Sequence, residues 1–317
     1  MPSTSLGTPR AVIDIGTNSV KLLVAKVDGA EIIPLAEDSK QTRLGRGFYE
    51  THLLQAEAIF ATAEAVFKFS EQAKSLGAEN IRVIATSAAR DALNPSDLLR
   101  AIREKTGLSV EIISGEQEAD WVFQGVASDP RLSEMPLLIT DVGGGSTEFI
   151  LGKGQQQFFR NSYRLGTVRL LEQLHPSDPP GEDALSQCRD WLNNFIETQI
   201  APSWADQLQK AEGEIQLVGT GGTTSILARM EKHLAEFDRE QIEATSISFQ
   251  KIQAQVERLW NIPLEERKKI VGLPPKRADV IIMGLAIYEA IMRRFGFREL
   301  RISTRGLRYA AVSTVNF

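Results

Sequence analysis

The sequence has few of the side chains that form cross-links or bind zinc. It contains one cysteine, Cys188, among 317 residues, so no disulfide can form within the chain. Its three histidines, His52, His175 and His233, lie far apart and in no ligand spacing, which argues against a histidine-rich zinc site. A Ser-His-Asp triad has equally little support. Any hydrolysis is therefore expected to depend on carboxylates and a hard metal ion.

Long apolar runs are also missing. No stretch approaches the roughly 20 apolar residues that cross a bilayer, and the first ten residues, MPSTSLGTPR, lack the apolar core of a signal peptide. With the single cysteine, these features predict a cytoplasmic protein that does not bind membranes, with a cysteine-poor periplasmic protein as the alternative. The length of 317 residues is enough for about two domains.

A strong positive charge is absent as well. The formal net charge is −5, so no broadly basic surface for nucleic acid is expected. The distribution is uneven, because the segment from Arg267 to Phe317 holds eleven Lys or Arg against three Asp or Glu. Such a segment can focus a polyanion onto one place, or it can consist of ordinary solvated helix faces. The second interpretation is preferred for most of these charges.

Three consecutive glycines are the first positive signal. They lie in DVGGGSTEFILG, from Asp141 to Gly152, directly after an apolar strand. Because glycine loses the most backbone freedom on folding, the run needs a physical reason. One reason is the geometry of a tight hairpin. The other is that backbone N–H groups without neighbouring Cβ atoms can approach an anion and point at it together.

The start of the chain carries a second copy of this pattern. AVIDIGTNSVKLLVAKVDG aligns without a gap on LLITDVGGGSTEFILGKGQ, so that Asp14, Gly16 and Ser19 fall on Asp141, Gly143 and Ser146. Each copy reads as a strand, an Asp-x-Gly turn and a second strand. Self-similarity at this offset predicts duplicated domains. Two such turns suit a polyphosphate chain with bound metal, although two unrelated turns remain an alternative.

The rest of the chain alternates strands and helices, which predicts an α/β fold with helices on the faces of a sheet. A polar, proline-containing segment, residues 127–136, interrupts the pattern, so the expected domains are 1–130 and 131–317, with a last helix that can pack back on the first domain. Strands are expected over 80–86, 109–114, 214–220 and 299–304. Helices are expected over 53–77, 95–107, 114–127, from about 166, from about 183, after 220, and over 276–296 and 305–312.

Three further sites deserve functional consideration. Residues Gly219 to Thr223 lie between a strand and a helix start, the geometry of an anion site, although helix–strand packing explains the glycines too. Arg90 follows a strand end, where α/β ligand clefts form, or it is a surface ion-pair residue. Glu118 lies in the first turn of a helix, where the helix dipole already favours acids, so its functional role needs outside support.

That support comes from five motifs taken together. They are DIGTNS (14–19), ATSA (85–88) followed by Arg90, SGEQEA (114–119), DVGGGSTE (141–148) and GTGGT (219–223). In this order they resemble the exopolyphosphatase/guanosine pentaphosphate phosphatase (Ppx/GppA) family, within the actin, sugar-kinase and heat-shock-protein superfamily. The resemblance covers about residues 10–312. It implies two actin-like domains, each with a five-stranded mixed sheet, and an active site in the cleft between them.

The resemblance also implies roles for individual residues. Glu118 would be the general base for the attacking water, and Asp141 would hold that water and a Mg²⁺ or Mn²⁺ ion, with Asp14 and Glu148 as further metal contacts. Phosphate binding would fall to Thr17, Asn18, Ser19, Arg90, Gly143, Gly144, Gly145 and Ser146. Gly221, Gly222 and Thr223 are added from their place at a helix start. The implied substrate is inorganic polyphosphate, with guanosine pentaphosphate as the alternative.

Some positions depart from the family pattern. Lys21 stands where many relatives have Arg, and Gln117 replaces one of a frequent acidic pair. Tyr309 and Ala310 stand where relatives commonly have Glu-Gly, which puts roles at that end in doubt. A C-terminal helical domain of longer relatives is not expected here, and this predicts a preference for short polyphosphate. A non-catalytic polyphosphate sensor, a kinase of the same superfamily and a homodimer all remain open.

Overall fold

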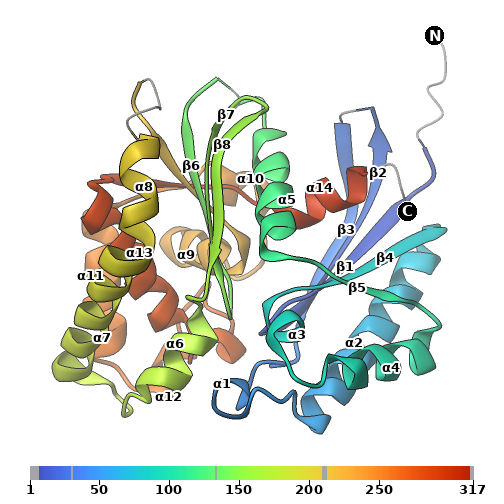
Figure 1. Ribbon diagram of the computed structural model, residues 1–317, viewed down its shortest axis with the longest axis horizontal. Helices are drawn as coiled ribbons and strands as arrows, with labels where there is room; N and C mark the ends of the chain where they lie inside the picture. Colours follow the sequence, from blue (N-terminus) through green and yellow to red (C-terminus); the bar gives the residue numbers. More distant parts are fainter. Residues whose placement is uncertain (1–6, 30, 133, 209–212, 315–317) are drawn as a thin grey trace. The chain divides into compact units, whose positions relative to one another are not determined.

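The chain folds into two units (Figure 1). The computed structural model describes residues 7–29, 31–132, 134–208 and 213–314. The first unit comprises the chain up to Ser128 together with the segment from Leu307 onward, and the second runs from Asp129 to Gly306. The final segment thus belongs with the first unit, although it follows the second in the chain. The end of the chain, including Phe317, lies outside the described residues.

The first unit is built on a five-stranded sheet of order β3-β2-β1-β4-β5. Strand β1 is antiparallel to β2 and parallel to β4. Its five residues after Arg10 are all buried, as expected for a central strand with both faces covered. The strands are β1 (Arg10–Ile15), β2 (Ser19–Asp28), β3 (Glu31–Gln41), β4 (Asn80–Ala85) and β5 (Val110–Ile112).

Helices pack on both faces of this sheet. Helices α2 and α4 contact one another, and α14 packs against α5, β1 and β2. The local sequence sets the helix ends, since Ser114 accepts a hydrogen bond from the Gln117 N–H at the start of α5, and Gly107 ends α4 in the left-handed conformation. The helices are α1 (Phe48–Thr51), α2 (Ala56–Ser75), α3 (Ser87–Asp91), α4 (Pro95–Thr106), α5 (Gly115–Ala127) and α14 (Leu307–Ser313).

The second unit contains a six-stranded sheet of order β10-β11-β9-β6-β7-β8. The expectation of five strands is therefore wrong for this unit, because the short strand β10 adds antiparallel to the edge of β11. The strands are β6 (Leu137–Val142), β7 (Thr147–Lys153), β8 (Gln156–Tyr163), β9 (Gln216–Thr220), β10 (Ser246–Ser248) and β11 (Glu299–Ile302).

The two sheets share one topology. The order β3-β2-β1-β4-β5 matches β8-β7-β6-β9-β11, and in both sheets three antiparallel strands are followed by parallel neighbours. Strand β1 corresponds to β6. Each Asp-x-Gly turn therefore follows the strand that is antiparallel to one neighbour and parallel to the other. The repeat seen in the sequence is thus a repeat of whole α/β units.

Helix α13 forms the centre of the second unit's helical layer. Twelve of its residues, Ile281 to Met292, are buried, and it packs against α6, α7, α9 and α11. It begins at Ile281 and not at Lys276, because residues 275–277 form a 3₁₀ turn after Pro274. The other helices are α6 (Thr167–Leu174), α7 (Gly181–Phe195), a π-helical segment (Ile196–Ile200), α8 (Ala201–Leu208), α9 (Gly221–Lys232), α10 (Arg239–Glu243), α11 (Phe249–Trp260) and α12 (Leu264–Arg267).

An ion-pair network lies where the second unit begins and ends. Arg131 contacts Asp129 and Glu243, both at 2.6 Å, and Glu243 lies 3.9 Å from Arg305. Asp129 is the first residue of the unit, and Arg305 comes just before its last, Gly306. Burial alone would raise the pKa of Asp129, but the hydrogen bonds and charge of Arg131 outweigh it and hold that pKa below its usual value.

Candidate active site

The first Asp-x-Gly turn connects β1 and β2. The Gly16 N–H donates to the Ser19 carbonyl at 3.0 Å and closes the turn. Thr17, Asn18 and Ser19 are all buried. The next loop holds the turn from outside, since the N–H groups of Thr42 and Arg43 donate to the Asn18 carbonyl and the Gly45 N–H donates to the Thr17 carbonyl at 2.7 Å.

These bonds fix the direction of the turn's N–H groups. In a planar trans peptide, the carbonyl and the N–H point in opposite directions. The Thr17 and Asn18 carbonyls face residues 42–45, so the N–H groups of Asn18 and Ser19 face away from that loop. A β-carbon on Gly45 would lie 2.3 Å from Thr17 Cγ2, so only glycine allows this approach.

Asp14 is buried beside this turn. Burial raises the pKa of its carboxyl, while the positive charges of Lys21 and Arg308 act in the opposite direction. Lys21 is its direct partner across β1 and β2. The Oδ1 atom of Asp14 is buried without a hydrogen-bond partner among the described residues. An orphaned carboxylate oxygen fits a bound cation or water.

Asn18 is held by a residue that the sequence did not indicate. Gln41 Nε2 donates to Asn18 Oδ1 at 2.9 Å. Asn18 Nδ2 and Gln41 Oε1 are both buried without partners within the described part of the chain. Buried amide groups normally find partners, so this pair is suited to receive a ligand or an ordered water.

Glu118 and Arg90 are brought together in the first unit. Arg90 Nη1 donates to Glu118 Oε2 at 3.0 Å and to the Ile113 carbonyl at 3.1 Å. Their side chains are largely buried, with 22% of Arg90 and 12% of Glu118 exposed. The sequence left Arg90 as either a phosphate ligand or an ion-pair residue, and the structure shows an ion pair with the candidate base. The two roles are compatible, because a guanidinium carries five N–H groups.

The second turn repeats the first. It connects β6 and β7, and the Gly143 N–H donates to the Ser146 carbonyl at 2.9 Å. This N–H was among the predicted phosphate donors, but the turn itself occupies it. The candidate donors are therefore the N–H groups of Gly144, Gly145 and Ser146.

Helix α6 holds the carbonyls of this turn. Thr167 N–H donates to the Gly143 carbonyl at 2.9 Å and Val168 N–H to the Gly144 carbonyl at 2.8 Å. Arg169 donates to the Gly145 carbonyl through its side-chain Nε at 2.9 Å. By the same peptide geometry, the N–H groups of Gly144, Gly145 and Ser146 all point away from α6. Successive N–H groups with one direction form an anion-binding nest.

Two carboxylates lie opposite one another beside this nest. Asp141 and Glu148 are direct partners across β6 and β7. Glu148 is buried and accepts a hydrogen bond from Ser162 Oγ at 2.7 Å. In the first unit the position corresponding to Glu148 is Lys21. Like charges directly opposite one another are destabilising. The Asp141–Glu148 pair therefore favours a bound cation, whereas in the first unit the ammonium group of Lys21 already lies opposite Asp14.

The third glycine loop approaches Asp141. Gly221 begins α9 with φ of +87°, and a β-carbon there would lie 2.2 Å from Asp141 Oδ1. The helix start therefore faces a carboxylate of the same unit, which the helix dipole favours. Thr223 is turned inward, because its hydroxyl donates to the Val142 carbonyl at 2.8 Å.

Arg277 is a candidate that the sequence did not indicate. Its Nη2 would lie 3.4 Å from a β-carbon on Gly222. Desolvation lowers the pKa of its guanidinium to about 10, with Asp279 acting in the opposite direction, so it stays cationic at neutral pH. Its only sequence signal was membership of the basic segment after Arg267.

The residues present fit a magnesium ion that binds with its substrate. Among residues 7–29, 31–132, 134–208 and 213–314, no three His, Cys, Asp or Glu side chains form a ready metal cluster. Mg²⁺ commonly takes one or two carboxylates and completes its shell with substrate phosphates and water. The Asp141–Glu148 pair of the second unit matches that requirement, and in the first unit the Oδ1 atom of Asp14, which has no hydrogen-bond partner among the described residues, is a separate candidate.

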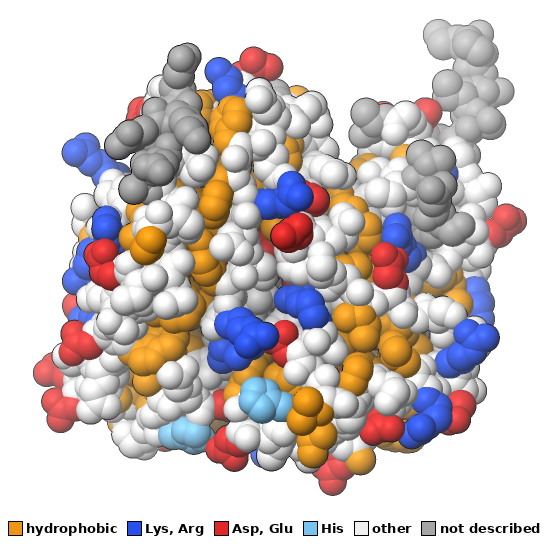
Figure 2. Space-filling view, viewed as in Figure 1, with side chains coloured by type: hydrophobic (Ala, Val, Ile, Leu, Met, Phe, Trp, Pro, Cys, Tyr) orange, Lys and Arg blue, Asp and Glu red, His pale blue; other side chains and the backbone are white. Residues whose placement is uncertain are grey.

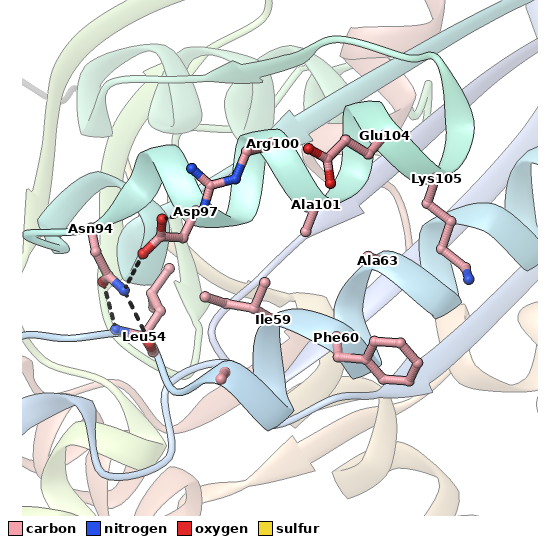
Figure 3. Close-up of a pocket in the computed structure, with 11 residues that line it drawn as sticks. Leu54, Ile59, Phe60, Ala63, Asn94, Asp97, Arg100, Ala101, Glu104 and Lys105 are labelled. Carbon is pink, nitrogen blue, oxygen red and sulfur yellow. Dashed lines mark hydrogen bonds and ion pairs between the residues drawn. The ribbon is translucent and has the colours of Figure 1, made fainter.

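An open groove on the first unit lies apart from these residues. It has a volume of about 720 Å³ between α2 and α4 (Figure 3), with Leu54, Ile59 and Ala63 in its apolar lining. Three of its polar side chains bind one another, since Asp97 accepts from Asn94 and Arg100. It contains none of the predicted site residues.

The comparisons with known proteins agree on one family. The model of the Ppx/GppA phosphatase family matches residues 23–312. The chain belongs to this family. It is 30% identical over 315 residues to Exopolyphosphatase 2 of Mycobacterium tuberculosis, covering 92% of this chain and 94% of that protein.

Solved structures lead to the same family. A family member from Aquifex aeolicus superposes with a TM-score of 0.77 at 28% identity, covering 96% of both chains. An exopolyphosphatase from Cytophaga hutchinsonii gives 0.85 at 25% identity, covering 95% of this chain and 96% of that one. The duplicated actin-like α/β fold follows. As a Ppx/GppA member, the chain is a hydrolase of phosphoric anhydrides.

No helix in the described ranges combines the length and the apolarity that crossing a membrane requires.

Proposed function

We propose that this Ppx/GppA member is an exopolyphosphatase that releases terminal orthophosphate from inorganic polyphosphate. The carrying observation is the nest formed by the N–H groups of Gly144, Gly145 and Ser146, which are oriented because α6 binds the carbonyls of residues 143–145, while Asp141 lies at the end of the preceding strand. Phosphoryl transfer depends on positioning and on neutralising charge, and oriented backbone N–H groups supply both. The names of the relatives support polyphosphate as the substrate.

In this proposal each unit supplies phosphate-binding groups of its own. The nest of the second unit holds the terminal phosphate, and in the first unit Thr17, Asn18 and Ser19 with Arg90 are proposed to bind phosphate. Gly221, Gly222 and Thr223, with Arg277 beside them, add a third contact to the phosphate chain. The cationic Arg277 and the backbone donors balance the negative charge of the chain.

Glu118 takes the proton of the attacking water. The water oxygen bonds to the terminal phosphorus while the bond from that phosphorus to the bridging oxygen breaks. The leaving group is polyphosphate shortened by one unit. Arg90 holds the Glu118 carboxylate in place, which is what a general base needs, because it must reach its proton in a fixed geometry.

A divalent cation is the proposed cofactor, Mg²⁺ or Mn²⁺. Asp141 and Glu148 would hold it, and Asp14, whose Oδ1 has no hydrogen-bond partner within the described ranges, is proposed as a further metal contact. When bound, the ion would neutralise charge on the phosphate oxygens and help orient water. Carboxylate oxygens are the ligands that these hard cations prefer.

A preference for short chains is also proposed. Most basic residues of the segment after Arg267 already bind carboxylates, so they do not form an open track for a long polyanion. Lys and Arg also alternate with Asp and Glu over the visible face (Figure 2). The paired residues are Arg267 with Asp178, Lys268 with Glu265, Lys269 with Glu266, Arg293 with Glu289, Arg294 with Glu197, Arg305 with Glu243 and Arg308 with Glu37.

A phosphate-release assay tests the proposal. Polyphosphate, guanosine pentaphosphate and ATP are compared with Mg²⁺, with Mn²⁺ and after exhaustive chelation. We expect the fastest release from polyphosphate and almost none without metal. Faster release from guanosine pentaphosphate would make that nucleotide the preferred substrate. Unchanged activity after chelation would show that no metal ion is needed. Binding of polyphosphate without turnover would identify a polyphosphate sensor.

A further inference from the structure

The three carbonyls of the glycine turn are held by different kinds of donor. Backbone N–H groups of α6 bind the Gly143 and Gly144 carbonyls. The Gly145 carbonyl is bound by a side chain, Arg169 Nε, at 2.9 Å. Arg169 is the third residue of α6, and its side chain reaches back over the helix start to the turn.

This one contact controls the direction of the last N–H of the nest. The Gly145 carbonyl and the Ser146 N–H belong to the same peptide plane, so fixing one fixes the other in the opposite direction. Glycine supplies no steric constraint of its own at Gly145, because it has no Cβ. The N–H groups at the start of α6 bind the Gly143 and Gly144 carbonyls. If Arg169 is replaced, none of them takes over the bond that fixes the orientation of the Gly145–Ser146 peptide.

The first unit shows that this device is not part of the common fold. There the Thr17 and Asn18 carbonyls are bound by backbone N–H groups, those of Thr42, Arg43 and Gly45. The corresponding turn in the second unit also needs Gly166, where a β-carbon would lie 2.4 Å from the Gly144 oxygen. Gly166 allows α6 to come close, and Arg169 completes the set of bonds.

We propose that Arg169 is a positioning residue that aims the Ser146 N–H at the phosphate. The proposal deepens the proposed function and rests on it. Arg169 acts through the Gly145 peptide and not by neutralising phosphate charge. Loss of one hydrogen bond to a charged group corresponds to about a 10- to 100-fold weaker affinity.

Three variants separate this role from a structural or purely electrostatic one. Arg169→Met removes the donor and keeps an unbranched apolar stem. Arg169→Lys keeps the charge, but its Cε takes the place of the donating Nε, so a methylene faces the Gly145 carbonyl. Arg160→Met is the matched control, because Arg160 is exposed on β8 and donates a hydrogen bond to Gln157.

The measurements are polyphosphate turnover, thermal unfolding and binding of inorganic phosphate with Mg²⁺, followed through the amide resonance of Ser146. We expect both Arg169 variants to bind phosphate about 10- to 100-fold more weakly, with a shifted Ser146 resonance in the free protein. Melting temperatures should stay near that of the unaltered protein, and Arg160→Met should match it throughout.

Each contrary result has its own meaning. Normal phosphate binding by Arg169→Met, or full recovery by Arg169→Lys, overturns the positioning role while the proposed function stands. A fall in affinity that only accompanies unfolding also overturns it. If the unaltered protein releases no phosphate from any polyphosphate, the proposed function fails and this inference fails with it.

Discussion

Two glycines of the second unit, Gly221 and Gly296, are required for different physical reasons. Substituting each by alanine distinguishes an effect on the site from an effect on stability alone. Gly221 combines a φ of +87° with the close approach of Asp141 Oδ1. Gly296 has a φ of +74° at the end of α13 but open space around it. Both positions penalise a side chain through the backbone, by about 1–2 kcal/mol, but only Gly221 also controls a carboxylate of the site.

We therefore expect Gly221→Ala to lose at least about 100-fold in turnover, because misplacing a catalytic group by about 1 Å can cost that much. Gly296→Ala should lose stability of similar size and keep turnover per folded molecule. Urea denaturation and phosphate release measure the two effects. Equal turnover in the two variants would show that Asp141 tolerates displacement.

Glu118 is the second residue whose role can be isolated. Glu118→Gln should lower turnover by at least about 100-fold, as expected for loss of a general base. Phosphate binding should survive, because the change removes a negative charge beside a polyanion. Glu116→Gln is the matched control, since Glu116 lies in the same first turn of α5 and is exposed. Near-normal turnover of Glu118→Gln would mean that Glu118 is not the general base and that it only stabilises the start of α5.

At the scale of elements, the two turns and most helices follow from the sequence because their signals are local. Ser114 caps α5, and Gly107 and Gly296 end α4 and α13 as their positions predict. Strand β3, with the sequence EIIPLAEDSKQ, has no residue in the buried class and was not predicted. β3 follows β2 directly in the chain and pairs with it antiparallel, but its internal Pro34 and its polar end, with Glu37 and Asp38, hide the alternation that marks a strand.

The site residues divide in the same way. Asp14 and Asp141 were predicted as site residues because their motif occurs twice, whereas the prediction for Glu118 needed the family resemblance. Arg277 and Arg169 carry no motif, and the roles proposed for them rest on their tertiary contacts with Gly222 and Gly145. A residue that acts through another segment's peptide leaves no signal in its own sequence neighbourhood.

The ion-pair network around Asp129 gives a prediction on pH. The folded-state pKa of Asp129 is lowered, so its stabilisation is present above the unfolded value near 4 and is lost as the pH falls through the folded value. Asp129→Asn should cost about 1 kcal/mol at pH 7, and this difference should shrink below about pH 4.

Urea denaturation at several pH values measures this difference. Glu71→Gln is the control, because the Glu71–Lys74 pair is exposed and contributes at most about 0.5 kcal/mol. A cost for Asp129→Asn that stays constant down to pH 3 would mean that the charge of Asp129 does not stabilise the fold.

At the scale of the whole molecule, the distribution of charge predicts a distributive enzyme. A processive enzyme must hold many phosphates away from the cleavage point, and the basic segment after Arg267 is mostly engaged with carboxylates. Exposed charges are also screened over about 8 Å at physiological salt. Partial digestion of long polyphosphate should therefore give a smoothly shortening ladder. Disappearance of whole chains without intermediates would require a separate binding track.

The placement of α14 has a consequence for how the protein is made. Helix α14 packs against α5, β1 and β2 of the first unit, but the ribosome synthesises it only after the whole of the second unit. The second unit is one continuous stretch of chain and can complete its core as it emerges. The first unit must wait, with the apolar surface that α14 covers still open to water. The half that is synthesised first is therefore expected to finish folding last, and chaperone contacts during translation should concentrate on its early strands.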